Sequence, residues 1–282
     1  SALMALRRLN CLGLENTQVR GNINALSAHT GLVVLAMSMT SVTGNLAALS
    51  GLTQLAHVFL HDTGVYGDLS AVRGLKQLVA LMLSNTKIRG ELAALDGASY
   101  LQILDLSKTA VTGTIQSLVG AQFMRIMLLT QVEVGGDLSV LSPMQNLELI
   151  RLYDTKVTGT LDFLHNLTRL QHLDLSSTAV TGELGPLAAA RSLVNVVLQR
   201  TDIDSGMPRL SHLENLTNVV ISDNCIGGRL GEDNIPPGLD GLILQGNHLS
   251  CELPALARTP SSQLVLPGNL FTGPLPSWVA MR

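Results

Sequence analysis

The chain has 282 residues, of which 46% are hydrophobic, 14% are charged and 3% are aromatic, and its formal net charge is −3. A chain this apolar and weakly charged can bury enough surface to fold, which excludes intrinsic disorder, and its mildly acidic balance offers no basic surface for nucleic acid. No uninterrupted apolar run is long enough to span a bilayer.

Glycine recurs along the chain at every twenty-third position. The interval holds without a break from Gly21 to Gly182, and Gly228 resumes it after Ser205 takes the place between them. A period this long indicates repeated supersecondary units that stack on one another. We therefore predict that the chain is built from repeats of this length.

Residues 101–123 illustrate one repeat, with Leu101 as position 1. Leu104 and Leu106, at positions 4 and 6, alternate with other residues, which predicts a short strand whose leucines share one face. Apolar residues at positions 11, 15 and 18 close the coil over the same core, and neighbouring repeats complete it. Gly113, at position 13, lets the backbone turn where a side chain would clash.

The pattern L-x-x-L-x-L-x-x-T-x-V-T-G-x-L-x-x-L resembles the leucine-rich repeat family, and about twelve such repeats cover the whole chain. Residues 269–278 resemble the plant-type subclass, whose repeats are twenty-three or twenty-four residues long, and earlier repeats depart from it by carrying Thr for Asn. The resemblance implies an α/β-class solenoid over residues 1–282, a right-handed horseshoe or superhelix with one parallel concave sheet of about twelve short strands.

Neither end of the chain carries a recognisable cap. The first repeat begins almost at Ser1, and the last stops at Arg282 within a return segment. Terminal repeats without caps expose core side chains and unpaired strand edges. We expect a fragment of a longer protein, or a partner that covers the ends.

Position 9 carries a polar residue that the resemblance places inside the coil, bonding the backbone of adjoining turns. Because an amide offers more hydrogen bonds than a hydroxyl, the Thr repeats are expected to be less cross-linked than the Asn repeats. Val132 fills the position once and offers none, which predicts a local break there. The residues of this structural ladder are Thr17, Thr40, Thr63, Thr86, Thr109, Thr155, Thr178, Thr201, Asn224, Asn247 and Asn269.

The concave face is the candidate binding surface, because positions 3, 5, 7 and 8 there are free of the core. Apolar groups on either side of an arginine and a tyrosine resemble the hot spots of protein interfaces. The alternative is that strands simply favour β-branched residues and that the charges pair with each other. The predicted partner-binding residues are Phe59, Met82, Ile103, Asp105, Ile126, Leu128, Arg151, Tyr153, Asp174, Val197 and Val220.

Motifs for chemistry are missing from the sequence. It contains no phosphate-binding loop, no nucleophile elbow and no zinc-binding helix, so we expect neither an enzyme nor a cofactor. His57 and His61 are too far apart along one strand to share a metal ion, so no metal site is expected. Three cysteines predict no disulfide framework.

Two further features carry weaker signals. Asn166 and Asn215 begin formal N-glycosylation sequons, although N-L-T also arises from the repeat itself. Position 14 holds a row of acidic residues. The row either attracts cations or a basic partner, or it is simply a solvated edge of the solenoid, and we favour the solvated edge. The row consists of Asp68, Glu91, Asp137, Glu183 and Glu252.

These observations predict a non-catalytic module for protein recognition or scaffolding. It would bind protein partners through the concave face and at the uncapped ends, and it could be an accessory subunit of a larger assembly. The alternative is a ligand-sensing ectodomain fragment of a receptor-like protein that reads a peptide or glycan. Ice binding by threonine ranks is a remote alternative, because Arg20, Tyr66, Arg89 and Asp204 interrupt the rank at position 12. The sequence leaves the compartment open, with the extracellular space or an organelle lumen favoured over the nucleus.

Overall fold

The computed structural model describes residues 8–252 and 263–274. It divides into two compact units, an N-terminal unit (Ser1–Val140 and Asp154–Lys156) and a C-terminal unit (Leu141–Tyr153 and Val157–Arg282). In the coil of residues 101–123, the chain forms a strand, β9 (Ile103–Asp105), a second strand, β10 (Ala110–Thr114), and a short 3-10 helix, η6 (Ile115–Leu118). The other coils repeat this order with small changes in length.

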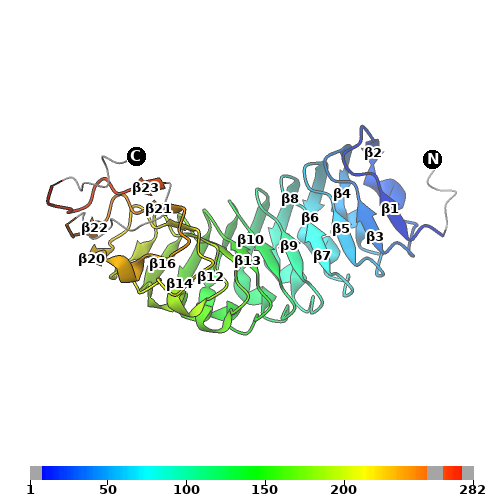
Figure 1. The fold of residues 1–282 in the computed structure, drawn as a ribbon. Helices are drawn as coiled ribbons and strands as arrows, with labels where there is room; N and C mark the ends of the chain where they lie inside the picture. The colour runs from blue at the N-terminus through cyan, green and yellow to red at the C-terminus, as the bar shows by residue number, and fades with distance from the viewer. Residues whose placement is uncertain (1–7, 253–262, 275–282) are drawn as a thin grey trace. The chain divides into compact units, whose positions relative to one another are not determined.

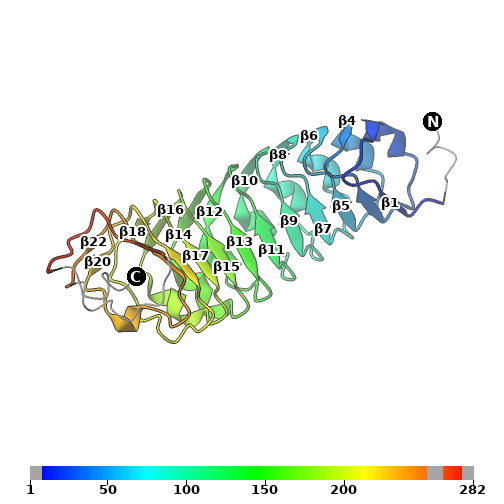
Figure 2. The same cartoon turned by 45° about the horizontal axis from the view of Figure 1, so that its top comes forward.

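The strands of positions 3 to 5 form the larger sheet, which holds twelve parallel strands in sequence order. Six lie in the N-terminal unit, where β3, β5 and β7 stand side by side (Figure 1), and six in the C-terminal unit, where β13, β15 and β17 do so (Figure 2). Their bounds are β1 (Cys11–Gly13), β3 (Val34–Ala36), β5 (His57–Phe59), β7 (Ala80–Met82), β9 (Ile103–Asp105), β11 (Ile126–Leu128), β13 (Leu149–Arg151), β15 (His172–Asp174), β17 (Asn195–Val197), β19 (Asn218–Val220), β21 (Gly241–Ile243) and β23 (Gln263–Val265).

A second parallel sheet, which the sequence analysis did not predict, runs through the return segments. It has nine strands, and a separate pair joins β20 to β22. Each coil therefore encloses its core between two layers of strand. The bounds are β2 (Arg20–Asn22), β4 (Ser41–Asn45), β6 (Gly64–Asp68), β8 (Lys87–Glu91), β10 (Ala110–Thr114), β12 (Glu133–Asp137), β14 (Lys156–Gly159), β16 (Ala179–Gly182), β18 (Asp202–Ile203), β20 (Gly227–Gly228) and β22 (His248–Leu249).

Short 3-10 helices follow the second strand in most coils. A 3-10 helix has three residues per turn, so the apolar residues at positions 15 and 18 lie on one side of it. In η3, Leu46 and Leu49 are both fully buried, whereas the alanines between them are less so or exposed. The helices are η2 (Ile23–Leu26), η3 (Leu46–Leu49), η4 (Leu69–Val72), η5 (Leu92–Leu95), η6 (Ile115–Leu118), η7 (Leu138–Leu141), η8 (Leu161–Asn166), η9 (Gly185–Ala189) and η10 (Glu232–Asn234).

The core is a column of aliphatic side chains inside the coils. Leu101, Leu104 and Leu106 have no solvent exposure, and the equivalent leucines of neighbouring coils are buried with them. Each fully buried aliphatic side chain contributes about 1.5–3 kcal/mol before the entropy of ordering is subtracted. In the described part of the chain, no helix has the length and apolar character needed to cross a membrane.

The glycine of position 13 is required by its backbone and by the neighbouring coil. Gly67 has a φ of 120°, and an added Cβ would lie 3.2 Å from the backbone nitrogen of Leu46 and in contact with the side chain of Asn45. That asparagine side chain accepts the backbone N–H of Ala47 and so caps η3. At Gly67 the repeated glycine thus reflects close approach between one coil and the cap of the preceding one, whereas at Gly21 and Gly228 an added Cβ meets no atom within 4 Å.

The polar residues of position 9 divide into two kinds. Thr86 donates to the carbonyl of Leu83 and Thr109 to that of Leu106, each at 2.6 Å and within its own coil. Asn224 instead donates to the carbonyl of Leu198 in the preceding coil, and its Oδ1 accepts the hydroxyl of Thr201 at 2.6 Å. The expectation that both residue types bond adjoining turns is therefore wrong for Thr86 and Thr109.

The coil that carries Val132 is continuous with its neighbour. Val132 is buried, and β12 follows it directly at Glu133. Thr112 of β10 pairs with Glu133, and the register continues to Gly135. The predicted break is therefore absent from the pairing of β10 with β12, because the sheet forms from backbone groups that a valine side chain does not affect.

Candidate binding surface

The strands of the larger sheet turn one face to the core and leave the other without cover from the described chain. In β9, the middle residue Leu104 is fully buried in the core, so Ile103 and Asp105 lie on the opposite face. We call this opposite face, made by positions 3 and 5 of each coil, the open face. It is the face that the sequence analysis expected to be concave and to bind a partner.

The N-terminal unit carries five large apolar side chains on its open face, spread over four neighbouring strands around Asp105. Phe59 pairs in register with Met82, and Ile103 pairs with Ile126. Leu128 completes this N-terminal cluster on β11, and all five side chains are partly exposed. The predicted apolar residues of this unit are therefore neighbours, as the constant repeat length implies. The ring of His57 stacks on Phe59 with the centroids 6.1 Å apart.

Asp105 lies within this cluster and is only 7% exposed. It is in register with Met82 on one side and Leu128 on the other. Its Oδ2 accepts the hydroxyl of Ser84 at 2.6 Å, and its Oδ1 accepts the backbone N–H of Ser107 at 3.0 Å. The sequence predicted that Asp105 lies on the open face, but it did not predict that the residue is buried there.

The C-terminal unit has its own row of predicted residues. Arg151 is in register with Asp174, which is in register with Val197, and Val197 with Val220. Tyr153 is 36% exposed. Arg151 and Asp174 form no ion pair in the described residues; Asp174 instead accepts the backbone N–H of Ser176 at 3.0 Å. Arg151 and Asp174 are therefore adjacent but do not form an ion pair, in contrast to the alternative that the charges of this face pair with each other.

A polar pair that was not predicted also lies on the open face. Asn218 donates to the side chain of Asn195 at 2.6 Å, and both occupy position 3 of adjacent coils. Beyond that face, at position 7, the Ser38 hydroxyl and His61 Nδ1 are 2.9 Å apart. Tabulating position 3 would have shown the Asn pair, because identical residues one repeat apart must be neighbours.

Two aspartates of the acidic row at position 14 have a structural role in capping, whereas Glu91 makes no side-chain cap bond. Asp68 accepts the backbone N–H of Ser70 at 2.9 Å at the start of η4, and Asp137 accepts that of Ser139 at 2.8 Å. The hydroxyl of Ser70 and then its backbone N–H lower the pKa of Asp68, and Ser139 lowers the pKa of Asp137 in the same way. Neither aspartate is held in a cluster with other acidic residues, so the solvated edge is the better description.

Replacing Ser70 with alanine is expected to raise the pKa of Asp68 toward 3.8, because the strongest donor to the charged form is lost. A lowered carboxyl pKa stabilises the folded chain above the unfolded value, and this contribution is lost as the pH falls through the folded value. Carboxyl-carbon NMR titration measures the change. The pKa of Asp137 in the same variant is the internal control; an unchanged Asp68 pKa would contradict the assignment.

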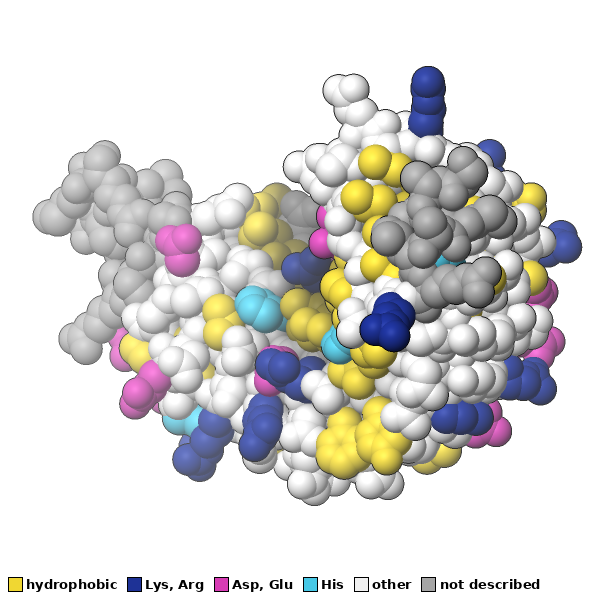
Figure 3. Space-filling model, turned by 90° about the vertical axis from the view of Figure 1, so that its right-hand side faces the viewer, with side chains coloured by type: hydrophobic (Ala, Val, Ile, Leu, Met, Phe, Trp, Pro, Cys, Tyr) yellow, Lys and Arg dark blue, Asp and Glu magenta, His cyan; other side chains and the backbone are white. Residues whose placement is uncertain are grey.

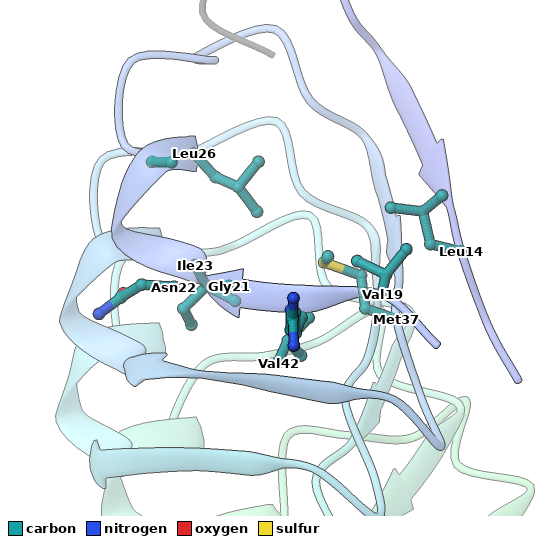
Figure 4. Close-up of a pocket in the computed structure, with 10 residues that line it drawn as sticks. Leu14, Val19, Gly21, Asn22, Ile23, Leu26, Met37 and Val42 are labelled. Atoms are coloured by element: carbon teal, nitrogen blue, oxygen red, sulfur yellow. The ribbon is translucent and has the colours of Figure 1, made fainter. Parts of the chain in front are cut away.

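A small apolar cavity lies at the first coil. Its volume is about 210 Å³ and its wall includes Leu14, Val19, Met37, Ile23 and Leu26. Figure 4 shows Leu14, Val19 and Met37 on one side of it and Ile23 and Leu26 on the other. The cavity is the accessible end of the aliphatic core, where the described chain contributes no earlier strand than β1 and β2.

Large apolar side chains are also exposed away from the open face. Tyr100 and Phe123 are 52% and 54% exposed and occupy position 23 of adjacent coils. Met39 is exposed as well, at the turn after β3. Figure 3 shows hydrophobic side chains at the surface on the side of the molecule that carries the N-terminus.

The remaining predicted sites show little chemistry. Asn166 is exposed and its amide donates to the Ser142 hydroxyl at 2.7 Å, and Asn215 is also exposed. All three cysteines are free, and burial raises the pKa of the Cys251 thiol. The described residues contain no group of three or more His, Cys, Asp or Glu that could hold a metal ion.

Solved structures similar to this chain are leucine-rich repeat proteins. The ectodomain of the Arabidopsis thaliana receptor kinase GASSHO1/SCHENGEN3, in complex with CASPARIAN STRIP INTEGRITY FACTOR 2, is 25% identical with a TM-score of 0.87; the match covers 98% of this chain and 38% of that one. The PEPR1–AtPEP1 structure is 21% identical with a TM-score of 0.82, and the match covers 98% and 44%. This chain therefore spans less than half the length of either.

A bacterial protein has the same architecture. An internalin from Listeria monocytogenes is 22% identical with a TM-score of 0.75, and the match covers 96% of this chain and 78% of that one. No protein-family model and no curated protein sequence matches the chain. The structural likeness and the parallel strands of the larger sheet confirm the predicted fold: the chain is a leucine-rich repeat solenoid.

Proposed function

We propose that the chain is a non-catalytic recognition or scaffolding module that binds a protein partner through the open face of its larger sheet. The observation that carries the proposal is the N-terminal cluster, in which five large, partly exposed apolar side chains lie around Asp105 on one face of four neighbouring strands. Contiguous exposed apolar surface on a soluble protein marks interaction sites.

The C-terminal row adds the polar component of such a site. Arg151 and Tyr153 are exposed side by side with Asp174 and Val197, and arginine and tyrosine are enriched among residues that dominate binding energy. The similar structures of GASSHO1/SCHENGEN3 and PEPR1 were solved with CASPARIAN STRIP INTEGRITY FACTOR 2 and AtPEP1, respectively, which supports recognition of a protein or peptide. We assign the plant-type repeat subclass and a single solenoid domain as part of this proposal.

The second candidate is a ligand-sensing ectodomain of a receptor-like protein, located outside the cell. It is supported by the likeness to plant receptor ectodomains, of which this chain spans only a part. The accessory subunit and the ectodomain differ in what surrounds the repeats. A leader peptide and a membrane anchor in the full-length precursor would favour the ectodomain.

Alanine at Leu128 or at Arg151 is expected to weaken partner capture at least about fivefold, since central apolar and arginine contacts each contribute more than about 1 kcal/mol in such interfaces. Capture is measured by pull-down from native extract with mass spectrometry of the retained proteins. Both side chains lie outside the core, so the free energy of unfolding is expected to stay within about 0.5 kcal/mol of the parent.

Matched controls separate the open face from the rest of the surface. Val119 is 51% exposed on the return side of the N-terminal unit, and Arg191 is exposed in the C-terminal unit. Val119→Ala and Arg191→Ala should leave capture unchanged. Loss of capture in these two variants with normal capture in Leu128→Ala and Arg151→Ala would refute the assignment to the open face.

A further inference from the structure

Asp105 is an unusual residue for the centre of an apolar cluster. The residue is only 7% exposed although it lies on the open face, in register with Met82 and Leu128. Burying a charged group removes it from water at a cost of several kcal/mol unless an opposite charge or hydrogen bonds replace the solvent. The partners of this carboxylate therefore decide whether it is satisfied.

The chain supplies Asp105 with neutral donors. Ser84 donates its hydroxyl to Oδ2 and Ser107 its backbone N–H to Oδ1, at 2.6 and 3.0 Å. Asp105 forms no ion pair within residues 8–252 and 263–274. Asp174, at the same position in the C-terminal unit, makes the same kind of bond to Ser176 but has Arg151 in register beside it. Among the described residues, Asp105 thus has hydrogen-bond donors but no cationic side chain within ion-pair distance.

The surroundings define what could supply the missing charge. Each carboxylate oxygen already accepts one bond and keeps lone pairs for further donors, and no second carboxylate, histidine or thiol joins it in a metal-binding group among the described residues. The neighbours Ile103, Met82 and Leu128 instead offer apolar contact. A long aliphatic side chain that ends in a cation satisfies both conditions.

We propose that Asp105 is the anchor for a lysine or arginine side chain of the protein partner, whose flanking apolar residues lie on the N-terminal cluster. This inference rests on the proposed function and specifies the chemistry of the partner. The ammonium or guanidinium group donates to the carboxylate, and the aliphatic stem packs beside Met82 and Leu128. Charge-assisted hydrogen bonds of this kind are about twice as strong as neutral ones.

Selection from a random peptide library displayed on phage tests the proposal. Peptides selected on the parent chain are expected to be enriched in Lys or Arg flanked by apolar residues, and the enrichment should be lost on Asp105→Asn. The asparagine keeps an oxygen that can accept the Ser107 N–H, and its NH2 group can donate to the Ser84 oxygen once that hydroxyl rotates, so the fold is expected to be preserved while the charge is removed. The free energy of unfolding of each variant verifies this.

A double-mutant cycle gives the decisive measurement. Replacing the selected lysine with norleucine, which keeps the stem, should weaken binding to the parent about tenfold and have little effect on binding to Asp105→Asn. Asp96→Asn is the matched control, because Asp96 is an exposed acid on the return side of the same unit. It should behave as the parent does.

The outcomes separate the two proposals. Equal weakening by norleucine on the parent and on Asp105→Asn overturns the role of Asp105. If Leu128→Ala lowers peptide binding while Asp105→Asn does not, the open face binds but the cation site is wrong. If no peptide is selected on the parent, or if neither substitution changes binding, both the cation site and the binding surface are refuted.

Discussion

Replacing Gly67 with alanine is expected to lower the free energy of unfolding by about 2–4 kcal/mol. About 1–3 kcal/mol comes from forcing a residue with a Cβ into a backbone conformation with a φ of 120°. About 1 kcal/mol more comes from displacing the Asn45 side chain from its cap on η3, because the new methyl group would meet that side chain. Urea denaturation followed by far-UV circular dichroism measures the change.

Gly51→Ala is the matched control for this experiment. Gly51 lies in the same unit, and a Cβ added there meets no atom within 4 Å. Its backbone has no positive φ of the kind that penalises side chains, so alanine should change stability by no more than about 0.5 kcal/mol. Equal losses at Gly51 and Gly67 would show that the repeated glycine is not required by the contact between coils.

The larger sheet was predictable from the sequence because its signal is local and repeated. The alternation around Leu104 identifies which side chains enter the core, and the fixed interval then places Ile103 beside Ile126. For the same reason, the neighbours of Arg151 and Val197 on the open face followed from counting alone. Register in a solenoid is a property of the repeat length.

The second sheet and the caps were less accessible to sequence reasoning. Strand β10 combines Ala110 and Gly113, which disfavour strands, with one buried valine and two threonines, which favour them, so its composition alone does not decide its structure. It becomes a strand because stacking brings it beside β8 and β12. The acidic residues of position 14 resemble a surface row until the start of each 3-10 helix is known, since a cap is recognised only from the helix that follows it.

The burial of Asp105 could not be predicted from the sequence, because it depends on three-dimensional packing. Its position on the open face was predictable, and so was its neighbour Leu128. Its 7% exposure and its bond from the Ser84 hydroxyl were not, because both depend on how the side chains of neighbouring coils are arranged around it. Sequence patterns report which face a residue occupies, whereas burial on that face depends on the sizes of neighbours in two other coils.

Replacing Asn247 with alanine is expected to cost about 2–4 kcal/mol, far more than the loss of a position 9 threonine hydroxyl. Asn247 is 3% exposed, and its Oδ1 accepts the N–H of Ile226 at 3.0 Å while its Nδ2 donates to the carbonyls of Ile221 and Leu244 at 2.7 and 3.1 Å. Leaving the buried N–H of Ile226 without an acceptor costs about 1–3 kcal/mol, and losing the bonds that the Asn247 amide donates costs about 1 kcal/mol more.

Thr178→Val provides the comparison in the same unit, because Thr178 is buried to a similar degree and its hydroxyl donates to Leu175 within its own coil. Its loss should cost only about 1 kcal/mol. Unfolding of stacked repeats need not be a single step, so native-state hydrogen exchange is the sharper measurement. The Ile226 amide is expected to exchange at least about tenfold faster in Asn247→Ala and at the parent rate in Thr178→Val. Similar exchange of this amide in both variants would mean that the asparagine does not link adjacent coils more firmly than the threonine does, and that the two residue types are interchangeable inside the solenoid.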